Sequence, residues 1–316
     1  MGIYQLNKFL QTNCRNAIKK VSLAELRNRC IAVDISIYLY KYAKENTVVE
    51  GIYKMISTMQ YYDIEPIFIF DGKPPEEKYE LLDSRRNKKR EAELKYHALK
   101  TKMEKVGKSR YDIEKDKTLQ NYKNIFIKIT KKDIDNAKKL ISIFGLRYYT
   151  AKNEADELCA SMVINGLAWA CLSEDMDLFV YGCPRILRYA SFINETAIIY
   201  EHANIMKCLG IDTNTFKDLC ILCGTDYNKG IDNIYKLFNK YKIYKKTHTE
   251  KSYHQWLYDT IYKNTDRINI GLIKQMFTVS DNIDEKIDIT QSHSQRQDFN
   301  LANLKKFLSS HDFIFV

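Results

Sequence analysis

Three short apolar runs in this chain each end in acidic residues. "CIAVDIS" carries Asp34, "PIFIFDGKPP" carries Asp71, and "LAWACLSED" carries Glu174 and Asp175. Each run is too short for a lone helix and is rich in Val, Ile, Phe or Trp, which predicts buried strands. Helical segments separate the runs. We therefore predict an α/β fold with a mostly parallel central sheet flanked by helices on both faces.

Carboxylates gather at these strand ends, where parallel sheets usually hold their ligands. Packed carboxylates repel each other and resist losing water unless positive charge compensates them. Mg²⁺ prefers such oxygen ligands, and two ions roughly 4 Å apart can activate water and stabilise the leaving oxygen of a phosphodiester. The candidate ligands are Asp34, Asp71, Glu154, Asp156, Asp175, Asp177 and Asp226. We predict two Mg²⁺ ions here, with Mn²⁺ as a substitute; a set of independent polar turns is the alternative.

The remaining segments have recognisable patterns. The apolar stripe in "TKKDIDNAKKLISIFG" predicts a helix that stops at Gly145, and "LRYYTA" predicts a strand. "KNEADELCASMVI" predicts a helix capped by Asn153. The dipole of this helix would by itself favour the acids in the first turn. "RILRYASFINETAIIYE" predicts a hairpin, and helices are expected from there to the end.

Positive charge is concentrated in one segment. The chain of 316 residues has a formal net charge of +10, and Lys78 to Arg110 contributes 12 basic and 5 acidic residues, a net +7. This balance favours a polyanionic partner such as nucleic acid. A solvated helix face is the plainer interpretation of a charge run. Between Glu76 and Lys132 we expect one or two exposed helices that leave the sheet.

Other features concern the compartment. No apolar run is long enough to span a bilayer, and the first residues lack the layout of a secretory signal. Eight scattered cysteines suit a reducing compartment, and Cys220 and Cys223 are interpreted as buried thiols in an apolar helix. We predict an intracellular protein without a membrane partner.

Six stretches of the sequence form a recognisable set. They are "MGIYQLNKFL", "IAVDISIYLY", "IFIFDGKPPEEK", "NEADELCAS", "LSEDMDLFVYG" and "CGTDYN", in order from residue 1 to about 230. Together they resemble the flap endonuclease family, within the XPG/Rad2 superfamily of structure-specific 5′ nucleases. The resemblance implies a PIN-like nuclease fold, two Mg²⁺ ions, and a branched DNA substrate with a 5′ single-stranded flap. It also implies structure-specific 5′ flap endonuclease activity, with possible 5′ to 3′ exonuclease activity, in replication or repair. The expected location is then the nucleus or a cytoplasmic site of DNA replication.

The resemblance implies four regions. Residues 1–75 and 133–225 would form the nuclease core, and residues 76–132 a basic helical arch through which the 5′ strand passes. Residues 226–316 would form a helix-hairpin-helix-like duplex-binding region followed by C-terminal helices.

The resemblance also assigns roles to individual residues. The seven acids match the family's metal-site acids, although Asp156 replaces what is usually a Glu, so its direct ligation is in question. Lys78 and Arg85 match catalytic cations near the scissile phosphate, which we call the gateway cations. Tyr40 matches an aromatic on which a base stacks; its plainer interpretation is a core tyrosine. Further DNA contacts are expected from Arg86, Lys88, Lys89, Arg90, Lys229 and Lys236.

Two departures from the family limit this resemblance. Asp232 and Asn233 replace the second Gly and the Pro of the usual Gly-Ile-Gly-Pro hairpin, which puts its monovalent ion site in question. The sliding-clamp peptide of many relatives is not seen, so clamp binding is not expected, and we expect a monomer. The alternatives in function are a 5′-end-directed ribonuclease with a PIN-like site and a catalytically silent DNA-binding scaffold.

Overall fold

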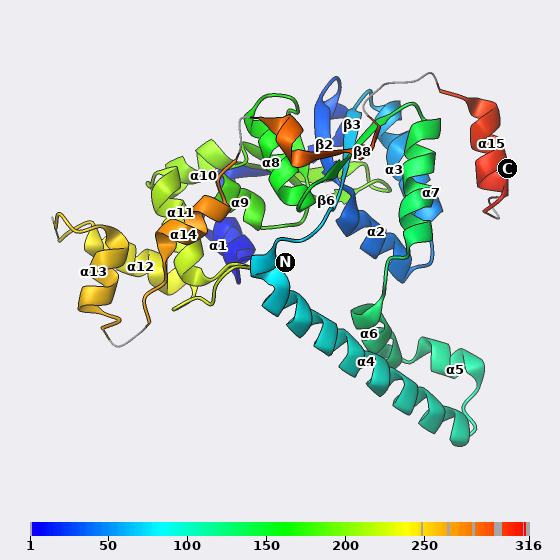
Figure 1. Ribbon diagram of the computed structural model, residues 1–316, viewed down its shortest axis with the longest axis horizontal. Coiled ribbons are helices and arrows are strands. Elements are labelled where there is room, and N and C mark those ends of the chain that lie inside the picture. Colours follow the sequence, from blue (N-terminus) through cyan, green and yellow to red (C-terminus); the bar gives the residue numbers. More distant parts are fainter. Residues whose placement is uncertain are drawn as a thin grey trace.

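One mixed sheet forms the centre of the protein (Figure 1). The structure is a computed structural model that describes residues 2–247, 249–263, 266–279, 282–293, 299–311 and 313. Within these residues the strand order is β1-β7-β6-β5-β2-β3-β4-β8. The strands are β1 (Ile18–Ser22), β2 (Cys30–Asp34), β3 (Glu65–Phe70), β4 (Arg147–Ala151), β5 (Ala170–Leu172), β6 (Arg185–Ser191), β7 (Thr196–Glu201) and β8 (Ile287–His293). The neighbours from β6 to β4 pair in parallel, whereas β7 and β8 are antiparallel to theirs.

The predicted strands that end in acids lie side by side in the middle of this sheet. The order β5-β2-β3 joins the three apolar runs, and β4 follows at the position of "LRYYTA". Alternate residues of these strands face opposite sides of the sheet. In β2, Ile31 and Val33 pack in one hydrophobic cluster and Ala32 packs in the other. The predicted fold class, with a parallel sheet buried on both faces, is therefore confirmed.

Helices cover both faces of the sheet. One face carries α2 (Ile35–Lys44), α3 (Val48–Tyr61), α7 (Lys131–Ile143) and α15 (Leu301–Ser309). The other carries α1 (Leu6–Asn13), α8 (Ala155–Ile164), α9 (Asp177–Tyr181), α10 (His202–Leu209) and α11 (Thr213–Cys223). Short 3₁₀ turns are η1 (Arg15–Ala17), η2 (Leu23–Leu26), η3 (Glu76–Lys78) and η4 (Ile283–Lys286). Cys220 and Cys223 are buried in α11, as predicted.

A helical arm projects from the body of the protein (Figure 1). It consists of α4 (Tyr79–Lys105), α5 (Arg110–Lys115) and α6 (Lys117–Phe126). The expectation of one or two helices is wrong, because Ser109 and Asp116 cap two further short helices after α4. Met103, Ile113 and Leu119 form a small buried cluster that holds the three helices together.

The C-terminal region returns to the central sheet. It contains α12 (Ile234–Tyr244), α13 (Tyr253–Thr260) and α14 (Ile270–Met276), and then β8 pairs with β4 at the sheet edge. Helix α15 packs Leu304, Phe307 and Leu308 into the same cluster as α3 and α7. The expectation of helices alone after the hairpin is thus wrong, because the β4 edge offers free backbone groups that β8 satisfies.

The start of α8 also differs from the prediction. Asn153 does not cap this helix; Glu154 occupies the cap position, and its side chain makes no capping bond. The Ala155 amide instead donates to Asp71 Oδ1 at 2.9 Å. A carboxylate from a neighbouring strand therefore replaces the local cap, which no sequence pattern around Asn153 could indicate.

None of the helices in the described ranges is both long and apolar enough to cross a membrane.

His202 gives a prediction about acid stability. Its ring is buried beside Phe216, and Nε2 has no hydrogen-bond partner among the described residues. Burial, helped by the charge of Lys217, lowers the pKa of His202 to about 4. Because the unfolded chain takes up this proton near pH 6.5, the native protein loses stability as the pH falls from 6.5 towards 4. Between pH 7 and 4.5 the loss is about 2 kcal/mol.

We expect His202→Gln to remove this part of the pH dependence. Urea unfolding of both proteins at several pH values measures the difference between them, and the contribution of every other titrating group cancels. Parallel stability curves for the two proteins would contradict the assignment.

Candidate active site

All seven candidate ligands lie at the same edge of the sheet. Asp34 is the last residue of β2, and Asp71 follows β3 directly. Glu154 and Asp156 begin α8, which follows β4. The remaining three, Asp175, Asp177 and Asp226, lie after β5, at the start of α9 and just after α11. Residues from almost two hundred positions of sequence are therefore brought to the carboxyl ends of adjacent strands.

Hydrogen bonds hold several of these carboxylates in place. Ser173 Oγ donates to Asp34 Oδ2 at 2.9 Å and accepts from the Asp175 amide at 3.1 Å. The Asp177 amide donates to Asp175 Oδ1 at 3.0 Å. Ser173 is fully buried, so the turn after β5 is fixed from below by a side chain that sequence reasoning missed. The only indication of this role in the sequence is that Ser173 directly precedes the acidic "EDMD".

The carboxylates are close enough to perturb each other. Asp34, Asp156 and Asp177 are at most 8% exposed. Burial raises the pKa of all three well above the usual range, and neighbouring acids raise it further: Asp71 acts on Asp34, and Asp175 on Asp156 and Asp177. Each ionised carboxylate here is therefore unfavourable until a cation joins the site.

The donor set fits a hard divalent ion. Asp177 Oδ1 is buried and has no hydrogen-bond partner among the described residues, as suits an oxygen that binds a cation. In the described part of the chain no group of three or more Asp, Glu, His or Cys side chains closes on one point. Mg²⁺ needs no such group, because it keeps several waters and binds through one or two carboxylates. The seven acids stay a predicted set of ligands.

Both gateway cations contact these acids. Lys78 is 3% exposed, and its Nζ lies 2.5 Å from Glu154 Oε2 and 3.6 Å from Asp226 Oδ2. Burial alone would lower the pKa of Lys78, but the charges of Asp156 and Glu154 raise it above its ordinary value. Arg85 Nη2 donates to both oxygens of Asp226, at 3.1 and 3.0 Å. Two basic residues at the base of the arm therefore partly neutralise the acidic cluster.

Glu174 is separate from the cluster. Its carboxylate accepts from the Tyr189 amide at 2.5 Å and lies 3.3 Å from Arg188, whose side chain is almost fully buried. The acid adjacent to Asp175 therefore balances a buried arginine, so its neighbourhood in sequence does not make it a ligand.

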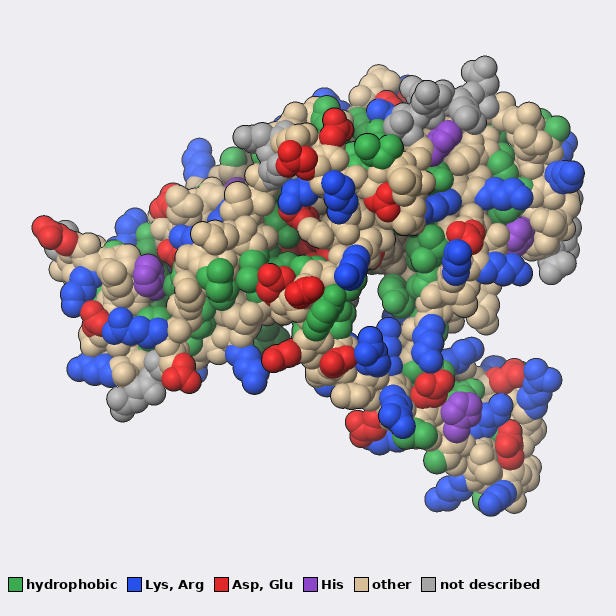
Figure 2. Space-filling model, in the orientation of Figure 1, with side chains coloured by type: hydrophobic (Ala, Val, Ile, Leu, Met, Phe, Trp, Pro, Cys, Tyr) green, Lys and Arg blue, Asp and Glu red, His purple; other side chains and the backbone are tan. Residues whose placement is uncertain are grey.

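The other predicted DNA contacts lie on the surface near the arm and the hairpin. Tyr40 is 40% exposed, and Lys89 Nζ lies 5.2 Å from its ring centre, so Tyr40 is not a core tyrosine. Arg86 is exposed and pairs with Asp83 at 2.9 Å, and Lys88 and Arg90 are exposed on the same helix. Figure 2 shows basic side chains along the arm.

The hairpin after α11 is organised around Asp232. Its carboxylate accepts from the Asn233 amide and the Tyr262 hydroxyl, and lies 3.3 Å from Lys236 and 3.2 Å from Lys240. Asn233 caps α12 by accepting from the Lys236 amide. Lysine ammonium groups thus already surround this carboxylate. Lys229 is exposed on the same turn.

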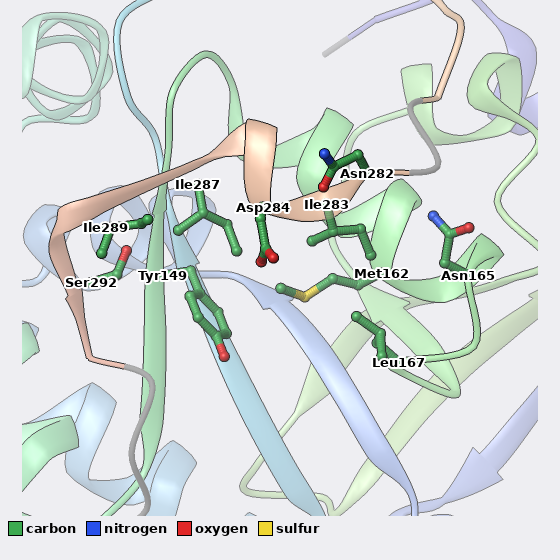
Figure 3. Close-up of a pocket in the computed structure, with 10 residues that line it drawn as sticks. All are labelled: Tyr149, Met162, Asn165, Leu167, Asn282, Ile283, Asp284, Ile287, Ile289 and Ser292. Carbon is green, nitrogen blue, oxygen red and sulfur yellow. The ribbon is translucent and has the colours of Figure 1, made fainter.

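A pocket elsewhere in the structure is not part of this cluster. It lies between β4, α8 and β8, has a volume of about 650 Å³, and is lined by Tyr149, Met162 and Ile287 among others (Figure 3). None of the seven acids lines it.

Gly2 packs directly against the acidic cluster and was also missed by sequence reasoning. Its φ is +76°, and a β-carbon at this position would lie 2.7 Å from Asp177 Oδ1 and 2.8 Å from Asp175 Oδ1. Gly2→Ala is therefore expected to displace the Asp175–Asp177 turn and to weaken Mg²⁺ binding about 10- to 100-fold, as disturbance of ligand supports does. Isothermal calorimetry measures this.

Gly166→Ala is the matched control, since Gly166 has a φ of +75° with nothing within 4 Å of the added carbon. Both changes impose the same backbone strain, so equal Mg²⁺ affinities in the two variants would show that the close approach is unimportant.

Comparison with known proteins identifies the family. Residues 1–92 match the XPG N-terminal domain, and residues 145–226 match the XPG I-region. The chain is 31% identical over 229 residues to flap endonuclease 1 of Methanococcus aeolicus, a match that covers 67% of each chain. It is 31% identical over 252 residues to flap endonuclease 1-B of Xenopus laevis, covering 74% of this chain and 63% of that protein. The chain therefore spans about two thirds of the length of these relatives.

Solved structures share the fold. The catalytic core of Rad2 in complex with DNA substrate has a TM-score of 0.67 at 21% identity, with 98% of this chain and 95% of that chain covered. Human GEN1 in complex with Holliday junction DNA has a TM-score of 0.65 at 18% identity, with 99% and 74% covered. Flap endonuclease-1 from Methanococcus jannaschii has a TM-score of 0.61 at 24% identity, with 94% and 91% covered. The fold is thus shared with these structures, and the two matched XPG regions together with the relatives at 31% identity show that the chain belongs to the XPG/Rad2 family of structure-specific nucleases.

Proposed function

We propose that this protein is a 5′ flap endonuclease that hydrolyses DNA phosphodiesters with two Mg²⁺ ions, and that it also removes nucleotides from 5′ ends. The observation that carries the proposal is the convergence of seven carboxylates at the base of a basic arm. We further propose that it acts as a monomer in intracellular DNA replication or repair.

The bound ions would supply an activated water and stabilise the leaving oxygen. The chain's own residues would prepare that reaction. Asp34, Asp175 and Asp177 would hold the ions on the turns fixed by Ser173. Lys78 and Arg85 lie beside Glu154 and Asp226, and there they would stabilise the charge that develops on the phosphate in the transition state. Burial of the cluster would strengthen each of these electrostatic interactions.

The arm is an argument for a substrate with a free single-stranded 5′ end. Figure 2 shows an opening between the arm and the body of the protein, with basic side chains near it. An opening of this kind suits a single strand, and basic side chains would bind its phosphates without reading sequence. The exposed Lys229 and Lys236 near the hairpin suit a duplex phosphate backbone. A flap junction combines both requirements.

Cleavage mapping tests the proposal. A labelled DNA flap, a matched RNA flap, a nicked duplex and a four-way junction are incubated with purified protein, with Mg²⁺ or with EDTA. We expect Mg²⁺-dependent cutting near the base of the DNA flap, and slower release of nucleotides at the nick. Cutting confined to RNA would favour the 5′-end-directed ribonuclease. Cutting confined to the four-way junction would replace the flap as substrate, and binding without any cutting would favour a silent scaffold.

A further inference from the structure

We propose that Tyr227 is a positioning residue that holds the Lys78 ammonium for catalysis. This inference rests on the proposed function and deepens it, because it says how the buried gateway cation is kept in place. Tyr227 follows Asp226 in the turn after α11, and Lys78 Nζ lies 4.7 Å from the centre of its ring. This distance is within the range at which a ring face attracts a cation.

The surroundings of Lys78 show why a ring is useful there. The ammonium is almost fully buried, with Glu154 Oε2 at 2.5 Å and Asp226 Oδ2 at 3.6 Å on its charged side. If carboxylates alone surrounded the ammonium, they would compete with the substrate phosphate for it. The Tyr227 ring contacts the ammonium without bearing a net charge. It can therefore keep Lys78 at the site when DNA and metal change the charge around the acids.

The ring itself is held firmly. Its partner Phe277 meets it edge to face, with centroids 5.3 Å apart and planes at 84°. Phe277 is fully buried and also packs against Tyr181 of α9, at 5.1 Å. The Tyr227 amide donates to Thr225 Oγ1 at 3.1 Å, which fixes the turn. The aromatic contacts thus connect α14 and α9 to the gateway lysine.

Two substitutions of Tyr227 separate the effect of the ring face from that of the side chain's volume. Tyr227→Phe keeps the ring face and loses only the hydroxyl, whereas Tyr227→Leu keeps an apolar side chain but has no ring face. We expect Tyr227→Phe to cut a DNA flap within about threefold of wild type and Tyr227→Leu to cut about 10- to 30-fold slower, which is the range of a desolvated cation–ring contact. Single-turnover rates at saturating protein and Mg²⁺ isolate the cutting step from DNA affinity.

A double-mutant cycle shows whether the effect passes through Lys78. In a Lys78→Met background, Tyr227→Leu should slow cutting less than about twofold further, because its target is gone. In an Arg85→Ala background it should still slow cutting about 10- to 30-fold, since Arg85 contacts Asp226 and not the ring. Equal effects in the two backgrounds would overturn the inference and leave Tyr227 as a packing residue.

Fluorinated phenylalanines at position 227 keep the test decisive if Tyr227→Leu does not fold. Successive fluorine atoms weaken the negative face of the ring with little change in its size. The rate should fall stepwise from phenylalanine to the difluoro and trifluoro variants, while the unfolding temperature stays constant. A rate independent of fluorination would overturn the inference. The proposed function fails separately, if wild type does not cut the DNA flap or if Asp177→Asn cuts it normally.

Discussion

Asp177→Asn is expected to abolish cleavage of a DNA flap while it stabilises the metal-free protein. The Asp177 carboxylate is 1% exposed, one of its oxygens lacks a partner among the described residues, and Asp175 is its nearest acidic neighbour in sequence. An amide removes one ligand charge from the proposed metal site. Since bound metal supplies several kcal/mol of transition-state stabilisation, the cutting rate should fall at least about a thousandfold.

The gain in stability follows from the sign of the pKa shift. Burial, then the charges of Asp175 and Asp226, raise the pKa of Asp177 well above its usual range. The native protein therefore loses stability as the pH rises from the unfolded value through the raised pKa, because ionisation is less favourable in the folded state. Asp177→Asn removes that loss. Its advantage should be present at pH 7.5 and should shrink as the pH falls and the wild-type carboxyl takes up its proton.

Glu174→Gln is the matched control three residues away. Its carboxylate lies 3.3 Å from the buried Arg188 and is not part of the acidic cluster. This change should therefore lower the free energy of unfolding, because it leaves a buried guanidinium without its counter-charge, while cutting and Mg²⁺ affinity stay near wild type. Calorimetric Mg²⁺ titration, urea unfolding and single-turnover cleavage measure all three quantities. If Asp177→Asn were destabilising and still active, it would have no place among the ligands.

The contrast between Glu174 and Asp177 shows which features of the site can be predicted from the sequence and which cannot. Apolar runs that end in acids predict both the parallel sheet and the convergence of Asp34, Asp71 and Asp175, because alternation and strand length are local properties. The direction in which Glu174 turns depends on Arg188, which lies on β6 and is a neighbour only after folding. For the same reason the Asp71 bond to the Ala155 amide could not be predicted.

The C-terminal part shows a second limit. Residues 287–293 carry no strong strand pattern, yet β8 forms because the edge of β4 provides unpaired backbone groups. The approach of Gly2 to Asp177 is equally non-local, since it depends on where α1 packs against the body. Long-range packing therefore decides the features that local patterns leave open.

Lys78→Met is expected to have the opposite effect on metal binding from Asp177→Asn, although both slow cleavage. Lys78 is buried between Glu154 and Asp226, so its removal leaves two acids without their nearest cation. The metal-free protein should lose about 3 kcal/mol of stability, as when one partner of a buried pair is removed. Mg²⁺ should then bind more tightly, because it no longer competes with the ammonium, and should restore more stability than in wild type.

The cutting rate at saturating Mg²⁺ should nevertheless fall about 100- to 1,000-fold, which is the usual cost of losing one preorganised group that stabilises transition-state charge. Lys88→Met is the matched control: Lys88 is exposed on α4, the helix that begins directly after Lys78, so its loss should weaken DNA binding and reduce its salt dependence without changing the saturated rate. Calorimetry and single-turnover cleavage separate the two roles. A Lys78→Met protein that bound Mg²⁺ more weakly than wild type would show that Lys78 supports the metal site, and a normal rate would remove it from the chemistry. Tighter metal binding with slower cutting is the combination expected only of a cation that neutralises the acids at rest and the phosphate during the reaction.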